Sequence, residues 1–555
     1  MNIAPSSWLT FVRSVLLGCL LVLADGFNFQ FSQASELTKS ADKQTELPYL
    51  RVGLDTKALL EGRGYRAKDH QIVVDDGYVL GLTSAYNPLI GHDVRRARGL
   101  KPVLLVHGTA VNANVYMVNS LGARAKNLLD LVDPRQLDIG SLIHLLEHEP
   151  SINSLAMLLL NFGYECWFLH RRGTAPSLER RFYHLKEGSL TPYEKLQRAY
   201  RLAYDEGRLS PEETNEQLLE QVNEEDSHGA DSIEDISADT ELLGLPKEAT
   251  NASALLDDKL RQLRKNNKFF DAIKGALPHK DSLGRLLKDI KTSFDSRLWN
   301  FSLDEQAAYD IPRAVEYVLQ QTESNQCIFV GNSASGGLGL MALILNPELN
   351  KQLSKVILLS PAFNMGHGSN KMLQVWKKKP PSLCCYTGPF PWTFISVRMQ
   401  VLYSILCSVE LMQDTLCQMM AASSSGPTGG QMPFRGEFFH TWGSPVSAFE
   451  YFQYFQQLIY KSTRFFHYGK KKNAILYGGK EEPPIYDARL ITNEHLSFWS
   501  SRYDTMIVDK DQRLLFEQLR GKLAEVVFCS CFNRIHWAAN SEVELVKACL
   551  MLSEY

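Results

Sequence analysis

Cysteine is scarce in this chain, with ten residues in 555. That number is too small for a disulfide scaffold, and no CxxC pair has zinc-ligand spacing. Charge of one sign is lacking as well, because 59 Lys and Arg face 62 Asp and Glu, for a formal net charge of −3. Such a balance produces no strong field for nucleic acid, so we expect no nucleic-acid partner.

No hydrophobic run is long enough to cross a bilayer, for which a helix needs about 20 apolar residues. The run closest to this length, Val15 to Ala24, has only ten residues and follows Arg13. Ala24 and Gly26 are small residues suited to cleavage after Gly26. This order predicts a secretory signal peptide over residues 1–26, with an uncleaved anchor as the alternative. The mature chain is therefore expected to be luminal or secreted.

Apolar residues make up 45% of the chain and charged residues 22%, which excludes wholesale disorder, a collagen-like repeat and a coiled-coil rod. Short apolar runs recur along the chain, with helical patterns between several of them. This alternation predicts an α/β protein whose mainly parallel sheet is covered on both faces. The predicted strands lie at 70–84 (a hairpin around Asp76-Gly77), 103–106, 165–169, 328–330, 356–359, 496–499 and 524–529.

Two segments interrupt the alternation. The first, over 175–298, has fourteen acidic residues and one arginine within 205–241, which predicts a disordered insertion. Eleven basic residues follow within 259–297, typical of a helix at a membrane or partner surface, or of a helix paired with the acidic run or with solvent. The second segment, within 365–470, is rich in Met, Trp, Phe and Pro and predicts a cap or lid over the sheet. A helical subdomain in the core is a compatible alternative.

The sharpest local feature is a strand that leads into Gly331-Asn-Ser-Ala-Ser335 and then into a helical pattern. This is nearly the nucleophile elbow G-x-S-x-G, in which strand and helix backbones crowd around the serine. Ser335 takes the place of the second glycine, and Gly336 and Gly337 follow at once. We interpret Ser333 as a nucleophile, with a structural or phosphate-binding turn as the alternative.

The order of other polar groups favours the nucleophile. An α/β-hydrolase places a carboxylate and then a histidine after its late strands. Asp504 follows the strand at 496–499, and His536 follows the strand at 524–529. Asp509 and Asp511 are rival carboxylates, but they are expected to open the next helix, where negative charge suits the helix dipole.

An oxyanion hole needs two backbone N–H groups, one of them from the loop after an early strand. The strand at 103–106 leads into His107-Gly108, so the predicted donors are the N–H groups of Thr109 and Ala334. His107 is expected to shape the turn rather than to transfer protons.

Several segments together resemble the acid lipase family of α/β-hydrolases, which contains lysosomal acid lipase and gastric lipase. The segments are HQIVVDDGYVLGL (70–82), KPVLLVHG (101–108), SLAMLLLNFGYECWFLHRRG (154–173), WNFSLDEQAAYDIPRAVEYV (299–318), SAFEYFQYFQQLIYKSTRFFHYG (447–469) and PPIYDARLI (483–491). The resemblance implies an α/β-hydrolase core formed by 48–174, 299–364 and 471–555, interrupted by the charged insertion and by the cap.

For function, the resemblance implies hydrolysis of triacylglycerols or sterol esters at a lipid-droplet or membrane interface, without a metal or organic cofactor. The triad would be Ser333, Asp504 and His536, and the destination secretion or the lysosomal lumen. The competing hypothesis is a weakly catalytic or inactive lipid-binding or interaction protein that kept the fold.

The resemblance also suggests a short lid disulfide, for which Cys407 and Cys417 are the candidates. Pairing of either with Cys384 or Cys385, or free buried thiols, are the alternatives. Two sequons, at Asn251 and Asn300, are candidate N-glycosylation sites, although sequons also arise by chance.

The chain departs from the family pattern at three turns. The elbow is usually GHSQG, the first oxyanion loop usually begins HGL where this chain has His107-Gly-Thr, and the family's Asn-Ser-Arg-Gly-Asn turn is His170-Arg-Arg-Gly-Thr174 here. We expect these changes to affect rate and substrate preference more than the fold.

Overall fold

The computed structural model describes residues 55–118, 124–130, 154–209, 295–369, 391–392, 441–501, 504–519 and 521–529. Several predictions from the sequence fall outside these residues. They concern the signal peptide at 1–26, most of the charged insertion and of the cap, Asn251, Cys407, Cys417 and His536.

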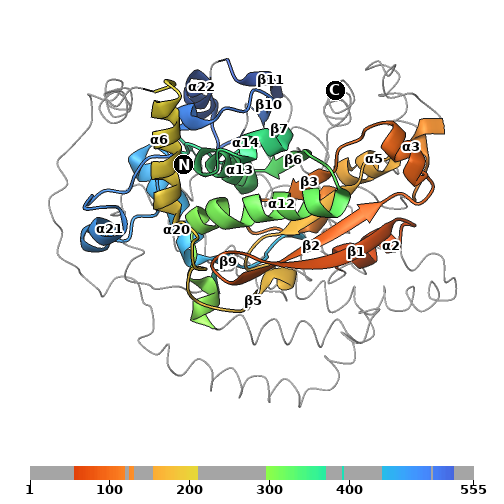
Figure 1. Cartoon of the computed structure of the whole chain (residues 1–555), viewed down its shortest axis with the longest axis horizontal. Helices are drawn as coiled ribbons and strands as arrows, with labels where there is room; N and C mark the ends of the chain where they lie inside the picture. The colour runs from red at the N-terminus through yellow and green to blue at the C-terminus, as the bar shows by residue number, and fades with distance from the viewer. Residues whose placement is uncertain are drawn as a thin grey trace, which may run out of the picture.

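One sheet organises the described part of the chain (Figure 1). Its strands run in the order β1-β2-β4-β3-β6-β7-β10-β11, with β5 on the edge of β2. The neighbours from β4 to β11 are parallel, whereas β1, β2 and β5 join antiparallel. The chain therefore has the α/β-hydrolase fold, with the mainly parallel sheet that the sequence predicted. The strands are β1 Arg66–Val73, β2 Tyr78–Tyr86, β3 Val103–Val106, β4 Cys166–His170, β5 Glu179–Arg180, β6 Cys327–Asn332, β7 Leu353–Leu359, β10 Leu496–Ser501 and β11 Leu523–Cys529, and a separate pair is formed by β8 Pro391–Trp392 and β9 Val446–Ser447.

Both faces of the sheet are buried, because successive side chains of each central strand enter different hydrophobic clusters. In β3, Leu104 and Val106 belong to the cluster on one face, and Val103 and Leu105 to the cluster on the other. All four are fully buried. A strand buried on both sides is an unbroken apolar run, which is why these strands were recognisable in the sequence.

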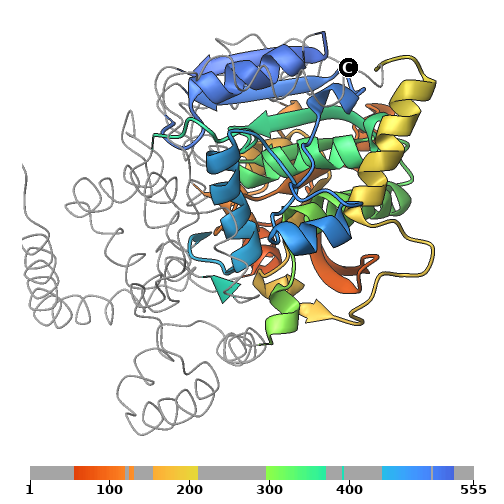
Figure 2. The same cartoon turned by 90° about the vertical axis from the view of Figure 1, so that its left-hand side faces the viewer.

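Helices cover both faces (Figures 1 and 2). The cluster on one face includes side chains of α6, α12, α13 and α20, and the cluster on the other includes those of α2 and α5. The helices are α2 Thr56–Glu61, α3 His92–Ala97, α5 Leu155–Asn161, α6 Pro192–Asp205, α11 Leu303–Glu305, α12 Ile311–Thr322, α13 Ala334–Leu345, α14 Leu349–Gln352, α20 Ala448–Tyr460, α21 Lys470–Leu476 and α22 Asp509–Gln518.

The amino-terminal hairpin forms where the sequence predicted it. β1 and β2 pair antiparallel, with Val73 opposite Val79. At the turn, Gly77 has φ of +85° and its N–H donates to the Val74 carbonyl. A Cβ on Gly77 would clash with the Phe182 backbone, so both the positive φ and the close approach require glycine here.

A π turn precedes α12 and aims two side chains into the protein. It covers Gln306–Asp310 and ends where Pro312, which has no N–H to continue the α-helical pattern, enters the first turn of α12. Gln306 and Asp310 are both buried and meet the arginines that follow β4. The turn therefore brings polar groups under the carboxyl edge of the sheet.

The first part of the predicted charged insertion is folded onto the core. α6 begins with a capping box, in which Thr191 and Glu194 satisfy each other's backbone N–H groups. Its Leu196, Ala199 and Ala203 are buried in the same cluster as α13.

Among the described residues, no helix is long and apolar enough to cross a membrane.

Candidate active site

Ser333 sits in a sharp turn between β6 and α13. It has φ of +53° and ψ of −114°, a combination that costs a non-glycine residue about 1–3 kcal/mol. The turn is held from β7, where the Leu359 carbonyl accepts from the Ser333 N–H at 2.7 Å. The Ser333 carbonyl accepts from the N–H of Ala362 at 2.9 Å. Strain that the surroundings enforce at a turn is typical of functional sites, and here it presents the half-buried serine at the carboxyl edge of the sheet.

Three glycines make the turn possible because no Cβ fits at their positions. A Cβ on Gly331 would lie 2.5 Å from the Ser335 carbonyl oxygen, and one on Gly336 would lie 2.8 Å from Pro361. A Cβ on Gly337 would clash with the Ala362 carbonyl. These contacts supply the crowding that the elbow motif encodes.

Ser335, which replaces the motif's second glycine, has a specific partner. Its side chain is fully buried, and Oγ donates to the His107 carbonyl at 2.5 Å. The elbow is thereby tied to the loop that follows β3. The replacement keeps the turn and adds a hydrogen bond to the neighbouring loop.

The loop after β3 lies directly against the elbow. A Cβ added to Gly108 would come within 3.2 Å of Ser333 Cβ, so the two backbones touch. The next residues are Thr109 and Ala110, and Ala110 has φ of +60°. The Ala110 carbonyl accepts from Gly443 N–H at 2.7 Å, which holds this left-handed residue in place.

His107 is occupied on both ring nitrogens. Nδ1 lies 2.9 Å from the Gly108 carbonyl, and Nε2 accepts from the Arg171 N–H at 3.1 Å. Burial, followed by the charge of Arg171, lowers the pKa of His107 well below its usual value. A neutral imidazole bonded at both ends fits the predicted role of shaping the turn.

Of the predicted donors, Ala334 follows Ser333 directly, and Thr109 follows Gly108, which lies close to Ser333. Ala334 opens α13, where the first N–H groups have no partner within the helix. Both N–H groups therefore belong to backbone next to the nucleophile.

Asp504 follows β10, at the same edge of the sheet as Ser333. The register aligns the carboxyl ends of β6, β7 and β10, since Asn332 and Trp499 both pair with Leu359. Asp504 is buried, and its Oδ1 accepts from the N–H groups of Met506 and Ile507 at 2.9 and 3.1 Å.

The rival carboxylates have other roles, as expected from their place in the first turn of α22. Asp509 pairs with Arg513 at 2.8 Å on the surface. Asp511 is fully buried and accepts from His367, at 2.6 Å from Nδ1. The His367 partner was not predicted, because 144 residues separate the two.

His536 lies outside the described residues. β11 ends at Cys529, seven positions earlier, in parallel register with β10 at the edge where Asp504 lies.

Asn300 is described and exposed, as a glycan site requires. Among the described residues, no group of His, Cys, Asp and Glu side chains could hold a metal ion.

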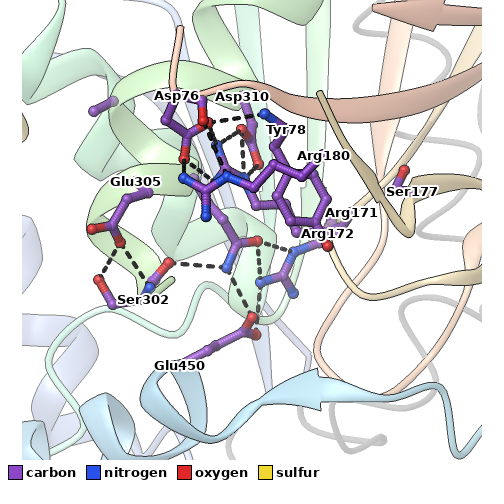
Figure 3. Close-up of polar contacts among 12 residues, drawn as sticks. Asp76, Tyr78, Arg171, Arg172, Ser177, Arg180, Ser302, Glu305, Asp310 and Glu450 are labelled. Carbon is purple, nitrogen blue, oxygen red and sulfur yellow. Dashed lines mark hydrogen bonds and ion pairs between the residues drawn. The ribbon is translucent and has the colours of Figure 1, made fainter. Parts of the chain in front are cut away.

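The sequence did not reveal a buried network of charged residues beside this site (Figure 3). The two consecutive arginines after β4 diverge. Arg172 pairs with Asp76 and Asp310, each at 2.6 Å, with its side chain fully buried. Arg171 pairs instead with Glu450 of α20 at 2.7 Å. The signal in the sequence was Arg171, which stands where the turn of the acid lipase pattern has a serine.

Arg172 joins the hairpin to the helix before the elbow. Asp76, predicted only as a turn residue, is buried, and Arg172 with Arg180 holds the pKa of its carboxyl below the usual value against the opposing effect of burial. The guanidinium also lies over the Tyr78 ring at 4.7 Å. Burial of this charge among two carboxylates and a ring makes it a structural centre of the fold.

The fold and this turn define an α/β-hydrolase with a serine elbow. No protein-family profile matches the chain. Its sequence is similar to mouse gastric triacylglycerol lipase (23% identity over 239 residues, 42% of this chain and 60% of the relative). It is also similar to rat lysosomal acid lipase/cholesteryl ester hydrolase (24% over 226 residues, 40% and 56%) and to human lipase member N (17% over 228 residues, 41% and 57%).

The resemblance to acid lipases is thus confirmed at low identity, and the chain spans less than two thirds of the length of these relatives. A solved structure with a similar arrangement is an esterase from Exiguobacterium antarcticum. It has 10% identity and a TM-score of 0.34, and it covers 87% of this chain and 99% of its own.

Proposed function

We propose that this chain is a serine hydrolase that cleaves carboxylic esters of neutral lipids, triacylglycerols or sterol esters, through an acyl-enzyme. The observation that carries the proposal is the turn at Ser333. Its backbone is strained, it is surrounded by glycines that cannot carry a Cβ, and it touches the loop at Gly108. A turn that only linked a strand to a helix would have no need for this strain.

In the proposed reaction, Ser333 Oγ attacks the ester carbonyl carbon while His536 takes the hydroxyl proton. The tetrahedral intermediate collapses as the bond to the alcohol breaks, and His536 gives the proton to the departing alkoxide. Water then attacks the acyl-enzyme with His536 again as base, which releases the fatty acid and restores Ser333. Asp504 would keep the imidazole in the right tautomer and stabilise the imidazolium.

The oxyanion would be bound by the N–H groups of Thr109 and Ala334. In other enzymes one such donor is worth about 3 kcal/mol of transition-state stabilisation. Side chains and backbone supply the nucleophile, base and donors in this mechanism, so we expect no metal or organic cofactor.

The lipid substrate is inferred from the named activities of the relatives and from the sequence. The Met- and Trp-rich cap segment would shelter the acyl chain, and the substrate would be met at a lipid-droplet or membrane interface. The predicted signal peptide places this reaction outside the cell or in the lysosomal lumen, with glycans proposed on Asn251 and Asn300.

A fluorophosphonate label on the full-length protein tests the nucleophile directly. We expect labelling of the wild type and none of Ser333→Ala. Ser324→Ala is a matched control, because this half-buried serine precedes β6, at the opposite edge of the sheet from Ser333. Absence of labelling in the folded wild type would favour the inactive lipid-binding alternative. A panel of glycerol and sterol esters, assayed from about pH 4 to 8, would then identify the substrate and the operating pH.

A further inference from the structure

The oxyanion loop is anchored by a buried ion pair. Thr109 Oγ1 donates to Glu450 Oε1 at 2.9 Å, lies 3.2 Å from the Tyr454 hydroxyl and accepts from Arg171 Nη1 at 3.4 Å. Arg171 and Glu450 form an ion pair at 2.7 Å, with side chains only 4% and 1% exposed. The Thr109 side chain is therefore directed toward α20, whereas the preceding residue, Gly108, lies close to Ser333.

Further hydrogen bonds hold this ion pair rigidly (Figure 3). Gln306 of the π turn accepts from Arg171 Nη2 at 3.0 Å and donates to Glu450 Oε2 at 2.8 Å. All three side chains are buried, so each has few alternative partners and the geometry is well determined.

Arg171 fixes the loop at two points. Its backbone N–H donates to His107 Nε2, and its guanidinium donates to Thr109 Oγ1. The residue between these contacts is Gly108, which lies against Ser333. The loop next to the nucleophile is thus held on both sides by one residue.

Two departures from the acid lipase pattern meet in this network. Thr109 stands where the family pattern has Leu, and Arg171 stands where it has Ser. Thr109 and Arg171 are 62 residues apart in the sequence. Their contact in space makes the oxyanion loop and the turn after β4 parts of one polar anchor. A feature of this kind beside the oxyanion hole needs a physical role.

We propose that Arg171 and Glu450 are positioning residues that, by binding the Thr109 hydroxyl, hold the Thr109 N–H in place for the oxyanion. This inference rests on the proposed function. An oxyanion donor works only if it is aimed before charge develops, and a displacement of about 1 Å can cost about 100-fold in rate. The adjacent residue Ala110 is left-handed, so the loop has a strained path that an anchor must maintain.

The test compares kcat and KM of full-length variants on a water-soluble p-nitrophenyl ester. Thr109→Val keeps the shape of the side chain and removes the hydroxyl, and we expect kcat to fall about 10- to 100-fold while KM changes little, because the lost interaction serves the transition state. Thr109→Ser restores the hydroxyl and should recover most of the rate. The rate of fluorophosphonate labelling should fall in parallel, since the phosphonyl oxygen needs the same donors.

Glu450→Gln removes the charge without changing the shape and should lower kcat similarly. Combining it with Thr109→Val should give a rate close to that of the slower single variant, because both changes act on the same contact between the Thr109 hydroxyl and Glu450. Two controls match the chemistry away from the site. Thr322→Val removes a hydroxyl that bonds only within α12, and Glu194→Gln neutralises the carboxylate of the exposed capping box of α6. Both should leave kcat unchanged.

The outcomes separate the two proposals. If the wild type hydrolyses the ester but the Thr109 and Glu450 variants keep its kcat, the anchor has no positioning role and the inference is overturned alone. Independent, multiplicative losses in the double variant would also overturn it. A folded wild type that neither labels nor hydrolyses would overturn the proposed function, and the inference with it.

Discussion

Replacing Ser335 by glycine would complete the literal G-x-S-x-G spacing, yet we expect it to destabilise the protein. The Ser335 hydroxyl is fully buried and donates to the carbonyl of His107, itself a buried residue. The serine is the second residue of α13. The common motif is therefore unsuited to this particular turn, because the glycine would leave the acceptor without its donor.

Two terms give the size of the effect. Removing the hydroxyl costs about 1 kcal/mol as a net hydrogen bond, and up to about 3 kcal/mol if the buried carbonyl finds no other donor. Glycine in a helix adds about 0.5–1 kcal/mol of backbone entropy relative to alanine. We therefore expect Ser335→Ala to cost about 1–3 kcal/mol and Ser335→Gly somewhat more.

Thermal and urea unfolding of the three proteins measure this directly. The expected order of Tm is wild type, then Ser335→Ala, then Ser335→Gly. Ser324→Ala is the control, because this half-buried serine should contribute less than about 0.5 kcal/mol to the free energy of unfolding. If Ser335→Gly were as stable as the wild type, the hydrogen bond to His107 would contribute nothing, and the explanation given for this departure from the motif would be wrong.

Three further predictions follow from the same structure. Asp504→Asn should lower kcat by about 10⁴ with little change in Tm, whereas Asp511→Asn should lower Tm and keep most of kcat; the reverse pattern would reassign the acid. Arg172→Ala should destabilise the protein by about 3–5 kcal/mol in urea unfolding, because it leaves two buried carboxylates uncompensated. Arg297→Ala, at an exposed ion pair, should leave the unfolding midpoint almost unchanged, and similar effects of the two variants would refute the structural role of Arg172. Burial lowers the pKa of His170 from 6.5 to about 4, so the unfolded chain binds a proton on this imidazole at a higher pH than the folded protein does. The free energy of unfolding should therefore fall by roughly 3 kcal/mol as the pH drops from 6.5 to 4. His170→Asn should remove that part of the pH dependence, measured as Tm from about pH 4 to 7.

The elements of the sheet, and the positions of Ser333 and Asp504 after their strands, could be predicted from the sequence. The central strands β3, β4 and β6 are buried on both faces, and such apolar runs are visible in a single sequence. The hairpin at Asp76-Gly77, the turn at Ser333 and the place of Asp504 after β10 all follow from local patterns. Asp509 and Asp511 were expected to open a helix, and α22 begins there, because carboxylates stabilise a helix amino terminus.

Which polar residues are buried together depends on the packing of distant segments. Asp76 carries a turn signal, and nothing within the hairpin shows that Arg172, 96 residues later, holds it. Arg171 and Glu450 lie 279 residues apart, and a charged residue is ordinarily read as exposed when only its neighbours in the chain are known. The packing of α20 against the turn after β4 brings Arg171 and Glu450 together, and their ion pair offsets the free-energy cost of burying both charges. That pairing depends on contacts between distant segments, which no local periodicity encodes.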